Sequence, residues 1–229
     1  MRGLDSLPVE LQEKFAALSH LLLEGQKRLN LTAIKEPAAI KRLHFLDSLA
    51  GLEAFPELMT VTHAADVGSG AGFPLLPLAI LTPGCHWIAL ESVAKKARFI
   101  EETAQALGLT NVEARPLRAE DAARTELRGS QDVVTARAVG PVASLCEVGL
   151  PLLKPGGTLL LYKTETALAE TAALQSSIAE LGGTALPAYR YRLEGDLQQR
   201  VILRLCKTAE TPEKYPRAAG VPFKKPLSA

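Results

Sequence analysis

The sequence has few of the residues that build covalent or metal-bound scaffolds, with three cysteines and four histidines among 229 residues. The cysteines lie far apart and form no CxxC motif, so neither a disulfide framework nor a cysteine zinc site is expected. The histidines form no HxxxH or HExxH pair, which argues against a histidine metal site. We therefore expect no bound metal ion.

Long apolar runs are missing too. The longest nearly apolar stretch covers residues 73–81 and is interrupted by Pro74 and Pro77, whereas a membrane-spanning helix needs about 18 or more apolar residues. The N-terminus carries acidic residues where a signal peptide has its apolar core. These absences predict a cytoplasmic protein with no membrane partner.

The net charge is only +1, and a neutral total on its own would argue against a nucleic-acid partner. Residues 27–42, however, hold five Lys or Arg and one acid, and residues 186–229 hold nine Lys or Arg and four acids. These two basic segments carry +4 and +5, and the remainder carries −8. Because the charge is so uneven, the low total excludes no partner.

Hydrophobic patterning divides the chain into three parts. Residues 1–60 carry apolar residues at helical spacing, which predicts an N-terminal helical cap. At residues 61–207, short apolar runs alternate with helical segments, as in a parallel sheet with helices on both faces. Residues 208–229 form a basic tail with several prolines and no periodicity, which we expect to be mobile or to become ordered late.

The middle part predicts an α/β fold with one sheet of seven strands, at residues 61–67, 86–91, 111–116, 131–136, 158–162, 185–193 and 200–205. The last two strands are separated by a turn that contains Gly195, which is typical of a hairpin. We therefore expect a doubly wound, mostly parallel sheet that ends in an antiparallel hairpin. A turn is expected at residues 154–157, and one helix at residues 167–181.

The strongest motif is DVGSGAGFP at residues 66–74, directly after the first strand. In a doubly wound sheet, ligands bind at the carboxyl ends of the strands, and glycines let the backbone pass close beneath a ligand. A plain tight turn would also use these glycines. Glu91, at the end of the second strand, is placed to accept hydrogen bonds from ribose hydroxyls, which favours nucleoside binding.

The glycine spacing helps to choose the nucleoside. Glycines stand at positions 68, 70 and 72 instead of in the GxGxxG pattern of dinucleotide enzymes, and Pro74 and Pro77 remove amide donors that a phosphate cradle needs. A GxGxG loop preceded by Asp66 resembles the S-adenosylmethionine-dependent methyltransferases, whose cofactor has no phosphate. A nicotinamide-dependent oxidoreductase stays open as an alternative.

Further segments extend the likeness to a single family. NLT at residues 30–32, HFLDSL at 44–49, the glycine loop at 66–74 and RAE at 118–120 together resemble the bacterial 16S ribosomal RNA guanine-N7 methyltransferases, also called the glucose-inhibited division protein B family. The segment at 135–138 is similar to the family's Ser-Arg-Ala segment, with alanine in place of serine. Tyr162 and Lys163 are similar to its Tyr-Lys segment, although Thr164 stands where glycine is usual. The resemblance covers about residues 25–207.

The resemblance implies methyl transfer from S-adenosylmethionine to N7 of one guanosine of 16S ribosomal RNA, G527 in the 530 loop. Guanine N7 has a lone pair and no proton to remove, so direct in-line attack needs alignment and no general base. The implied partner is 16S ribosomal RNA or the small ribosomal subunit, and a monomer is expected. Methylation of another RNA, a protein or a small molecule stays open, as does a non-enzymatic RNA-binding role.

The resemblance and the basic segments together assign candidate site residues. Arg137 and Lys163 are expected to grip the acceptor base or its phosphate; the alternative for Arg137 is an ion pair with a carboxylate of the cofactor site. His44 and Asp47 could pair at the entrance of the cofactor pocket or form a surface pair. The residues expected at the cofactor are Asp66, Gly68, Ser69, Gly70, Gly72, Phe73, Glu91, Ser92, Ala119, Glu120 and Arg137. The residues expected at RNA are Lys27, Arg28, His44, Lys163, Arg200, Lys224 and Lys225.

Overall fold

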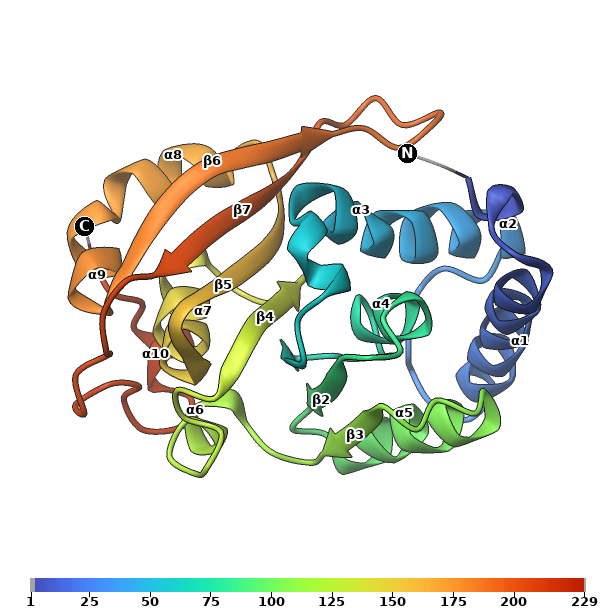
Figure 1. Cartoon of the computed structure of the whole chain (residues 1–229), viewed down its shortest axis with the longest axis horizontal. Coiled ribbons are helices and arrows are strands. Elements are labelled where there is room, and N and C mark those ends of the chain that lie inside the picture. The colour runs from blue at the N-terminus through green and yellow to red at the C-terminus, as the bar shows by residue number, and fades with distance from the viewer. Residues whose placement is uncertain (1–2, 229) are drawn as a thin grey trace.

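The computed structural model describes residues 3–228, and strands within this range form one sheet in the order β3-β2-β1-β4-β5-β7-β6 (Figure 1). The strands are β1 (His63–Val67), β2 (His86–Leu90), β3 (Val112–Arg115), β4 (Gln131–Arg137), β5 (Leu153–Thr164), β6 (Gly183–Tyr191) and β7 (Arg200–Lys207). β1 to β5 pair in parallel, and β7 lies antiparallel between β5 and β6. The predicted doubly wound sheet with its closing hairpin is confirmed.

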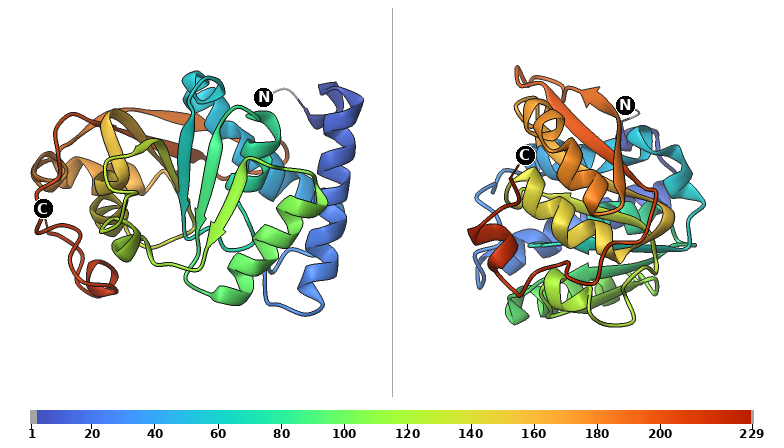
Figure 2. Two further views of the ribbon diagram at one scale, coloured as in Figure 1. Left: turned by 60° about the horizontal axis from the view of Figure 1, so that its bottom comes forward. Right: turned by 90° about the vertical axis from the view of Figure 1, so that its left-hand side faces the viewer.

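Helices cover both faces of this sheet (Figures 1 and 2). They are α1 (Val9–Gln26), α2 (Pro37–Ile40), α3 (Asp47–Ala54), α4 (Leu75–Leu81), α5 (Ala94–Ala106), α6 (Ala119–Ala122), α7 (Val142–Gly149), α8 (Ala167–Ala173), α9 (Gln175–Glu180) and α10 (Val221–Lys224). Neighbouring residues of a strand point to opposite faces, so Ala64 packs in the core with α1, α3, α4 and α5, and Ala65 packs in the core with α6, α7, α8 and α9. No helix of residues 3–228 has both the length and the apolar character needed to cross a membrane.

The N-terminal helices share their core with the sheet. Phe15 of α1 and Ala50 of α3 are buried in the same cluster as Trp87 of β2. A π-helical segment, Lys41–Leu46, joins α2 to α3. π-helical turns are rare and occur often at functional sites, and this one carries His44. The division into a cap, a sheet domain and a tail stays a prediction.

Two local predictions were wrong. The turn expected at residues 154–157 lies inside β5, whose register with β4 shifts between Gln131 and Val133 to accommodate the extra residues. Gly156, with φ of 86°, supplies the left-handed backbone of this bulge. The single helix expected at residues 167–181 is divided at Leu174 into α8 and α9.

The C-terminal tail, expected from composition to be mobile or to become ordered late, is packed in the structure, because buried polar contacts hold it against the body. Arg217 forms an ion pair with Glu147 of α7, whose side chain is fully buried. The hydroxyl of Ser144 donates to the carbonyl of Pro222 at 2.8 Å. α10 therefore packs on α7 (Figure 1), although nothing in the periodicity of the tail indicates it.

Replacement of Arg217 by Ala should lower the free energy of unfolding by about 3 kcal/mol, because it leaves the buried Glu147 carboxylate without its cation. The matched control is Lys214→Ala in the same segment, which removes an exposed pair with Glu180 and should cost less than about 1 kcal/mol. Urea unfolding of both variants measures the two effects. Equal losses would show that the buried pair does not anchor the tail.

Candidate cofactor and acceptor site

The glycine loop after β1 runs along the carboxyl edge of the sheet, and each of its glycines has a positive φ. A Cβ at Gly68 would lie 2.7 Å from a methyl carbon of Val139, and one at Gly72 would overlap Leu76. Gly70 differs, since the nearest atom to its Cβ would be a carbonyl oxygen 3.9 Å away. Gly68 and Gly72 therefore permit close packing, whereas Gly70 keeps open a space above the loop.

Three adjoining cavities follow this edge. The loop cavity, of about 460 Å³, lies along the glycine loop. The β3-side cavity, of about 220 Å³, shares Gly68, Ser92 and Val139 with it. The β5-side cavity, of about 430 Å³, shares His44, Arg137 and Ala138 with the loop cavity. The loop cavity therefore lies between the other two and contacts both.

Most of the residues predicted at the cofactor line the loop cavity or the β3-side cavity. Those that do are Gly68, Ser69, Gly70, Phe73, Glu91, Ser92, Ala119, Glu120 and Arg137. Asp66 and Gly72 are buried and line none of the three cavities.

The residues predicted at RNA divide into two groups. His44, Lys163 and Arg200 line the β5-side cavity. The other four line none of the three cavities, and their side chains are exposed; they are Lys27, Arg28, Lys224 and Lys225.

Asp66 is fully buried and incompletely hydrogen-bonded. Its Oδ1 accepts from the hydroxyl of Thr135 at 2.7 Å, whereas its Oδ2 has no partner. Burial raises the pKa of Asp66 to about 7. A carboxylate with one free oxygen beneath an open loop is suited to a cationic ligand, which would favour its charged form.

Two further acids already accept backbone hydrogen bonds. Glu91 Oε2 accepts from the amide of Gly70 at 2.9 Å, and its Oε1 accepts from the amide of Val93 at 2.8 Å. Glu120 Oε1 accepts from the amide of Gly220 at 2.8 Å. Each carboxylate oxygen has a second lone pair, so both side chains can still accept a hydroxyl or amine proton.

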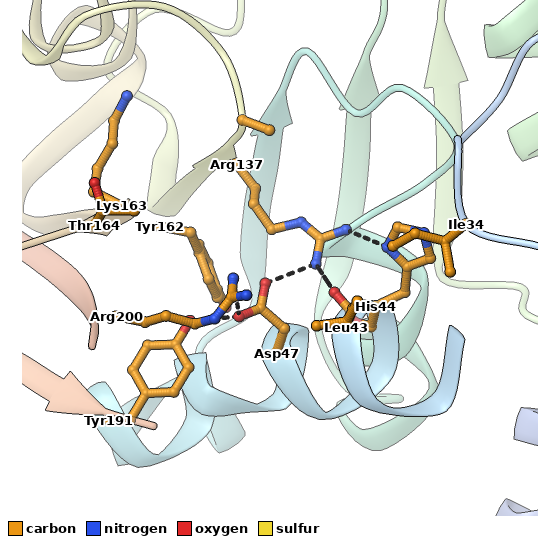
Figure 3. A pocket seen from close by; sticks show the side chains of 11 residues that line it. Ile34, Leu43, His44, Asp47, Arg137, Tyr162, Lys163, Thr164, Tyr191 and Arg200 are labelled. Atoms are coloured by element: carbon orange, nitrogen blue, oxygen red, sulfur yellow. Dashed lines mark hydrogen bonds and ion pairs between the residues drawn. The ribbon is translucent and has the colours of Figure 1, made fainter. Parts of the chain in front are cut away.

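Arg137 and Asp47 form the centre of the β5-side cavity (Figure 3). Arg137 Nη1 donates to Asp47 Oδ2 at 2.9 Å and to the carbonyl of Leu43 at 3.2 Å. Asp47 Oδ1 accepts from the hydroxyl of Tyr191 at 2.7 Å and lies 3.4 Å from Arg200 Nη1. The ion pair considered for Arg137 exists, but its partner is the helix residue Asp47 and no acid of the cofactor loop.

The expected pairing of His44 with Asp47 is wrong, because Arg137 binds both side chains. Neither residue is on the surface; His44 is 9% exposed and Asp47 is 3% exposed. Asp47 was expected only as a possible partner of His44 and was assigned neither to the cofactor nor to RNA, although its position in the HFLDSL segment was the available signal.

The proton on His44 can be placed from its partners. Burial, followed by the charge of Arg137, lowers the pKa of His44 to about 4, so the ring is neutral near pH 7. An arginine only donates, so Nδ1 accepts from Arg137 at 3.1 Å and the ring proton is on Nε2, which donates to Thr32 Oγ1 at 2.9 Å. Thr32 Oγ1 also accepts from the amide of Ile34. Its own hydroxyl proton is thus available to an acceptor in the loop cavity, which Thr32 lines.

The ring of Phe73 packs against both His44 and Arg137. Its ring stacks on His44 with centroids 4.6 Å apart and planes 8° apart, and the guanidinium of Arg137 lies 5.4 Å from its centroid. Phe73 is buried. Phe73 thus holds in place His44 and Arg137, which line both the loop cavity and the β5-side cavity.

Lys163 points away from the Arg137–Asp47 pair (Figure 3). Its ammonium donates to the carbonyls of Val139 and Gly140, and burial lowers its pKa. The neighbouring Ala138 has φ of 56°, a left-handed conformation that costs about 1 kcal/mol or more for a residue other than glycine. Lys163 thus stabilises a strained loop beside both cavities.

Comparison with known proteins gives the family. A family model described as rRNA small subunit methyltransferase G, GidB, matches residues 11–191. The chain belongs to this family. A protein of Deinococcus radiodurans named ribosomal RNA small subunit methyltransferase G is 42% identical over 226 residues, which cover 98% of this chain and 88% of that protein.

Solved structures agree on the fold. An O-methyltransferase structure from Klebsiella pneumoniae, described there as putative, has a TM-score of 0.58 at 15% identity and covers 84% of this chain and 90% of its own. TYW2 of M. jannaschii, solved in complex with AdoMet, has a TM-score of 0.53 at 14% identity and covers 70% and 76%. This chain is thus an S-adenosylmethionine-dependent methyltransferase with a Rossmann-like fold, as its motifs predicted.

Replacement of Asp66 by Asn should change how stability depends on pH. The pKa of Asp66 is about 7 in the folded protein, above the ordinary value of 3.8. Between about pH 4 and 7 the native state therefore binds more protons than the unfolded state. The contribution of Asp66 to the free energy of unfolding consequently falls as the pH rises through that window. His44 acts in the opposite sense, because its folded pKa is lowered.

The comparison of wild type with Asp66→Asn cancels the His44 contribution. The free energy of unfolding of the variant, relative to wild type, should rise with pH from 5 to 8 by at most about 1.4 kcal/mol per pH unit. Urea unfolding without ligand at each pH measures the difference. Parallel pH curves would contradict a raised Asp66 pKa.

Proposed function

We propose that this chain methylates N7 of a guanosine in 16S ribosomal RNA, G527 of the 530 loop, with S-adenosylmethionine as the methyl donor. The observation that carries the proposal is the wall of His44, Arg137 and Ala138 shared by the loop cavity and the β5-side cavity. A cofactor in the first cavity and a base in the second would meet at this wall. The names of the relatives support an rRNA substrate.

The residues present fit the cofactor. The open space above Gly70 can hold the amino-acid end of the cofactor without a clash, and the charge of Asp66, buried below that space, would attract its cationic amine. Glu91 has lone pairs left for ribose hydroxyls, and Glu120 and Ala119 line the β3-side cavity for adenine. When bound, the cofactor supplies an electrophilic methyl group on a sulfonium.

The acceptor guanine is assigned to the β5-side cavity. Its N7 carries no proton that must be removed, and His44, which lines this cavity, is not available as a base, because its Nδ1 already accepts from Arg137. Catalysis then depends on alignment and on the exclusion of water. Arg137, fixed by Asp47, is proposed to hold the base, while Lys163 acts as a positioning residue through the loop carbonyls that it binds.

The exposed lysines and arginines of the two basic segments are proposed to hold RNA phosphates. Lys27 and Arg28 follow α1, and Lys224 and Lys225 lie at the end of α10. Lys27 is paired with Glu24 in an exposed contact, which costs little to exchange for a phosphate. An RNA that contacts both ends of the chain would span the carboxyl edge of the sheet.

The function is tested by transfer of a tritiated methyl group from S-adenosylmethionine to unmethylated small-subunit RNA, followed by nucleoside analysis. We expect label in 7-methylguanosine at one site. Gly70→Asp should abolish transfer, because the new side chain fills the cofactor space, while Gly108→Asp should not. Gly108 is the matched control, because its φ of 65° is similar and nothing lies within 4 Å of its Cβ position. Label only in protein, a metabolite or another nucleoside would overturn the proposal.

Replacement of Asp47 by Asn should reduce methyl transfer by about 100-fold, because a misplacement of catalytic groups by about 1 Å can have that effect. The change removes the charge that holds Arg137 and Arg200. Asp196→Asn is the control, since it removes the other carboxylate partner of Arg200 and should leave transfer close to wild type. Rates are compared at a temperature at which circular dichroism shows both variants folded. Equal rates would exclude a positioning role for Asp47.

A further inference from the structure

One wall of the β3-side cavity comes from a distant part of the chain. The cavity is lined by residues that follow β1 to β4, among them Gly68, Ser92, Glu120 and Val139. The remaining wall is Phe223, which belongs to α10. Phe223 lies beyond residues 11–191, which the family model matches.

The position of Phe223 is fixed by its neighbours. A Cβ at Gly140 would lie 2.7 Å from the ring, so the ring packs directly against the loop after β4. Gly140 has φ of 43° and precedes α7, on which α10 packs. The glycine thus permits an approach that any larger residue would prevent.

The segment that carries Phe223 is anchored to the same cavity. Gly220, with φ of 79°, is the N-cap of α10, and its amide donates to the Glu120 carboxylate. Glu120 is 2% exposed and is itself a lining residue of the β3-side cavity. Arg217, three residues earlier, is held by the buried Glu147. Two buried acids, Glu147 and Glu120, therefore hold Arg217 and Gly220 in place, and these residues precede Phe223 in the same segment.

The cavity matches a purine in its chemistry. Its walls are apolar at Val67, Leu90, Leu117 and Val139, and Glu120 offers a carboxylate at one side. A purine has two apolar faces and a polar edge, and stacking on an aromatic ring is worth roughly 1–3 kcal/mol per base by alanine substitution. The ring of Phe223 supplies an aromatic surface on which a purine can stack.

We infer that the C-terminal segment 217–223 completes the cofactor pocket and that Phe223 packs against the adenine ring of S-adenosylmethionine. This inference rests on the cofactor placement in the proposed function and extends it to a part of the chain outside the matched family region. Phe223 is a cofactor-binding residue in this assignment, and Gly220 and Arg217 are positioning residues.

The test is calorimetric binding of S-adenosylhomocysteine and of adenosine to the full-length protein. Phe223→Ala should raise the Kd for both ligands by about tenfold, whereas Phe223→Tyr, which keeps the ring, should restore the wild-type Kd. Leu227→Ala is the control, because Leu227 packs on the same core and does not line the cavity. Phe223→Leu distinguishes a flat ring from mere apolar volume. It keeps apolar volume without the ring, so its Kd should stay raised as in Phe223→Ala.

A spectroscopic readout distinguishes contact from support. In Phe223→Trp, the indole emission should change when S-adenosylhomocysteine or adenosine binds and should not change with methionine. The single native tryptophan, Trp87, is fully buried in the sheet, and wild type gives its background signal. Unchanged emission, or wild-type Kd in Phe223→Ala, would overturn the inference even if rRNA methylation is normal. Failure of wild type to bind S-adenosylhomocysteine would instead overturn the proposed function.

Discussion

Asp47 holds together groups from three strands at the carboxyl edge of the sheet. Its two oxygens bind Arg137 of β4, Tyr191 of β6 and Arg200 of β7, and it is itself the first residue of α3. A buried carboxylate is stable only when its charge is balanced and its lone pairs are used. Asp47 meets both conditions only if the helix and the strands keep their relative positions, so the shape of the β5-side cavity depends on it.

The same arrangement fixes the polarity of every hydrogen bond around His44. Arg137 can only donate, so the imidazole must accept on one side and donate on the other, and Thr32 receives the donated proton. Because both ring nitrogens of His44 are engaged, the ring is held in one orientation and is not free to transfer a proton. This suits an acceptor atom that already carries its lone pair and loses no proton.

The sequence was informative where the physics is local. Strands, their order of appearance and the glycine loop followed from apolar runs and turn residues, and the cavities contain most of the predicted cofactor residues. The partner of Arg137 could not be predicted, because Asp47 is distant in the chain and pairs through tertiary packing. The order of the tail was missed for the same reason: Arg217 and Glu147 become neighbours only when α7 and the tail are folded together.

The insertion of β7 between β5 and β6 has a consequence for the order of assembly. A chain leaves the ribosome N-terminus first, so β6 emerges before β7, the strand with which it pairs. Until β7 follows, β5 presents an open edge, which is a surface prone to wrong pairing. Asp47 meanwhile lacks Arg200, which is the first residue of β7. The nascent enzyme thus acquires its protected sheet edge and the second cation beside Asp47 in one late step.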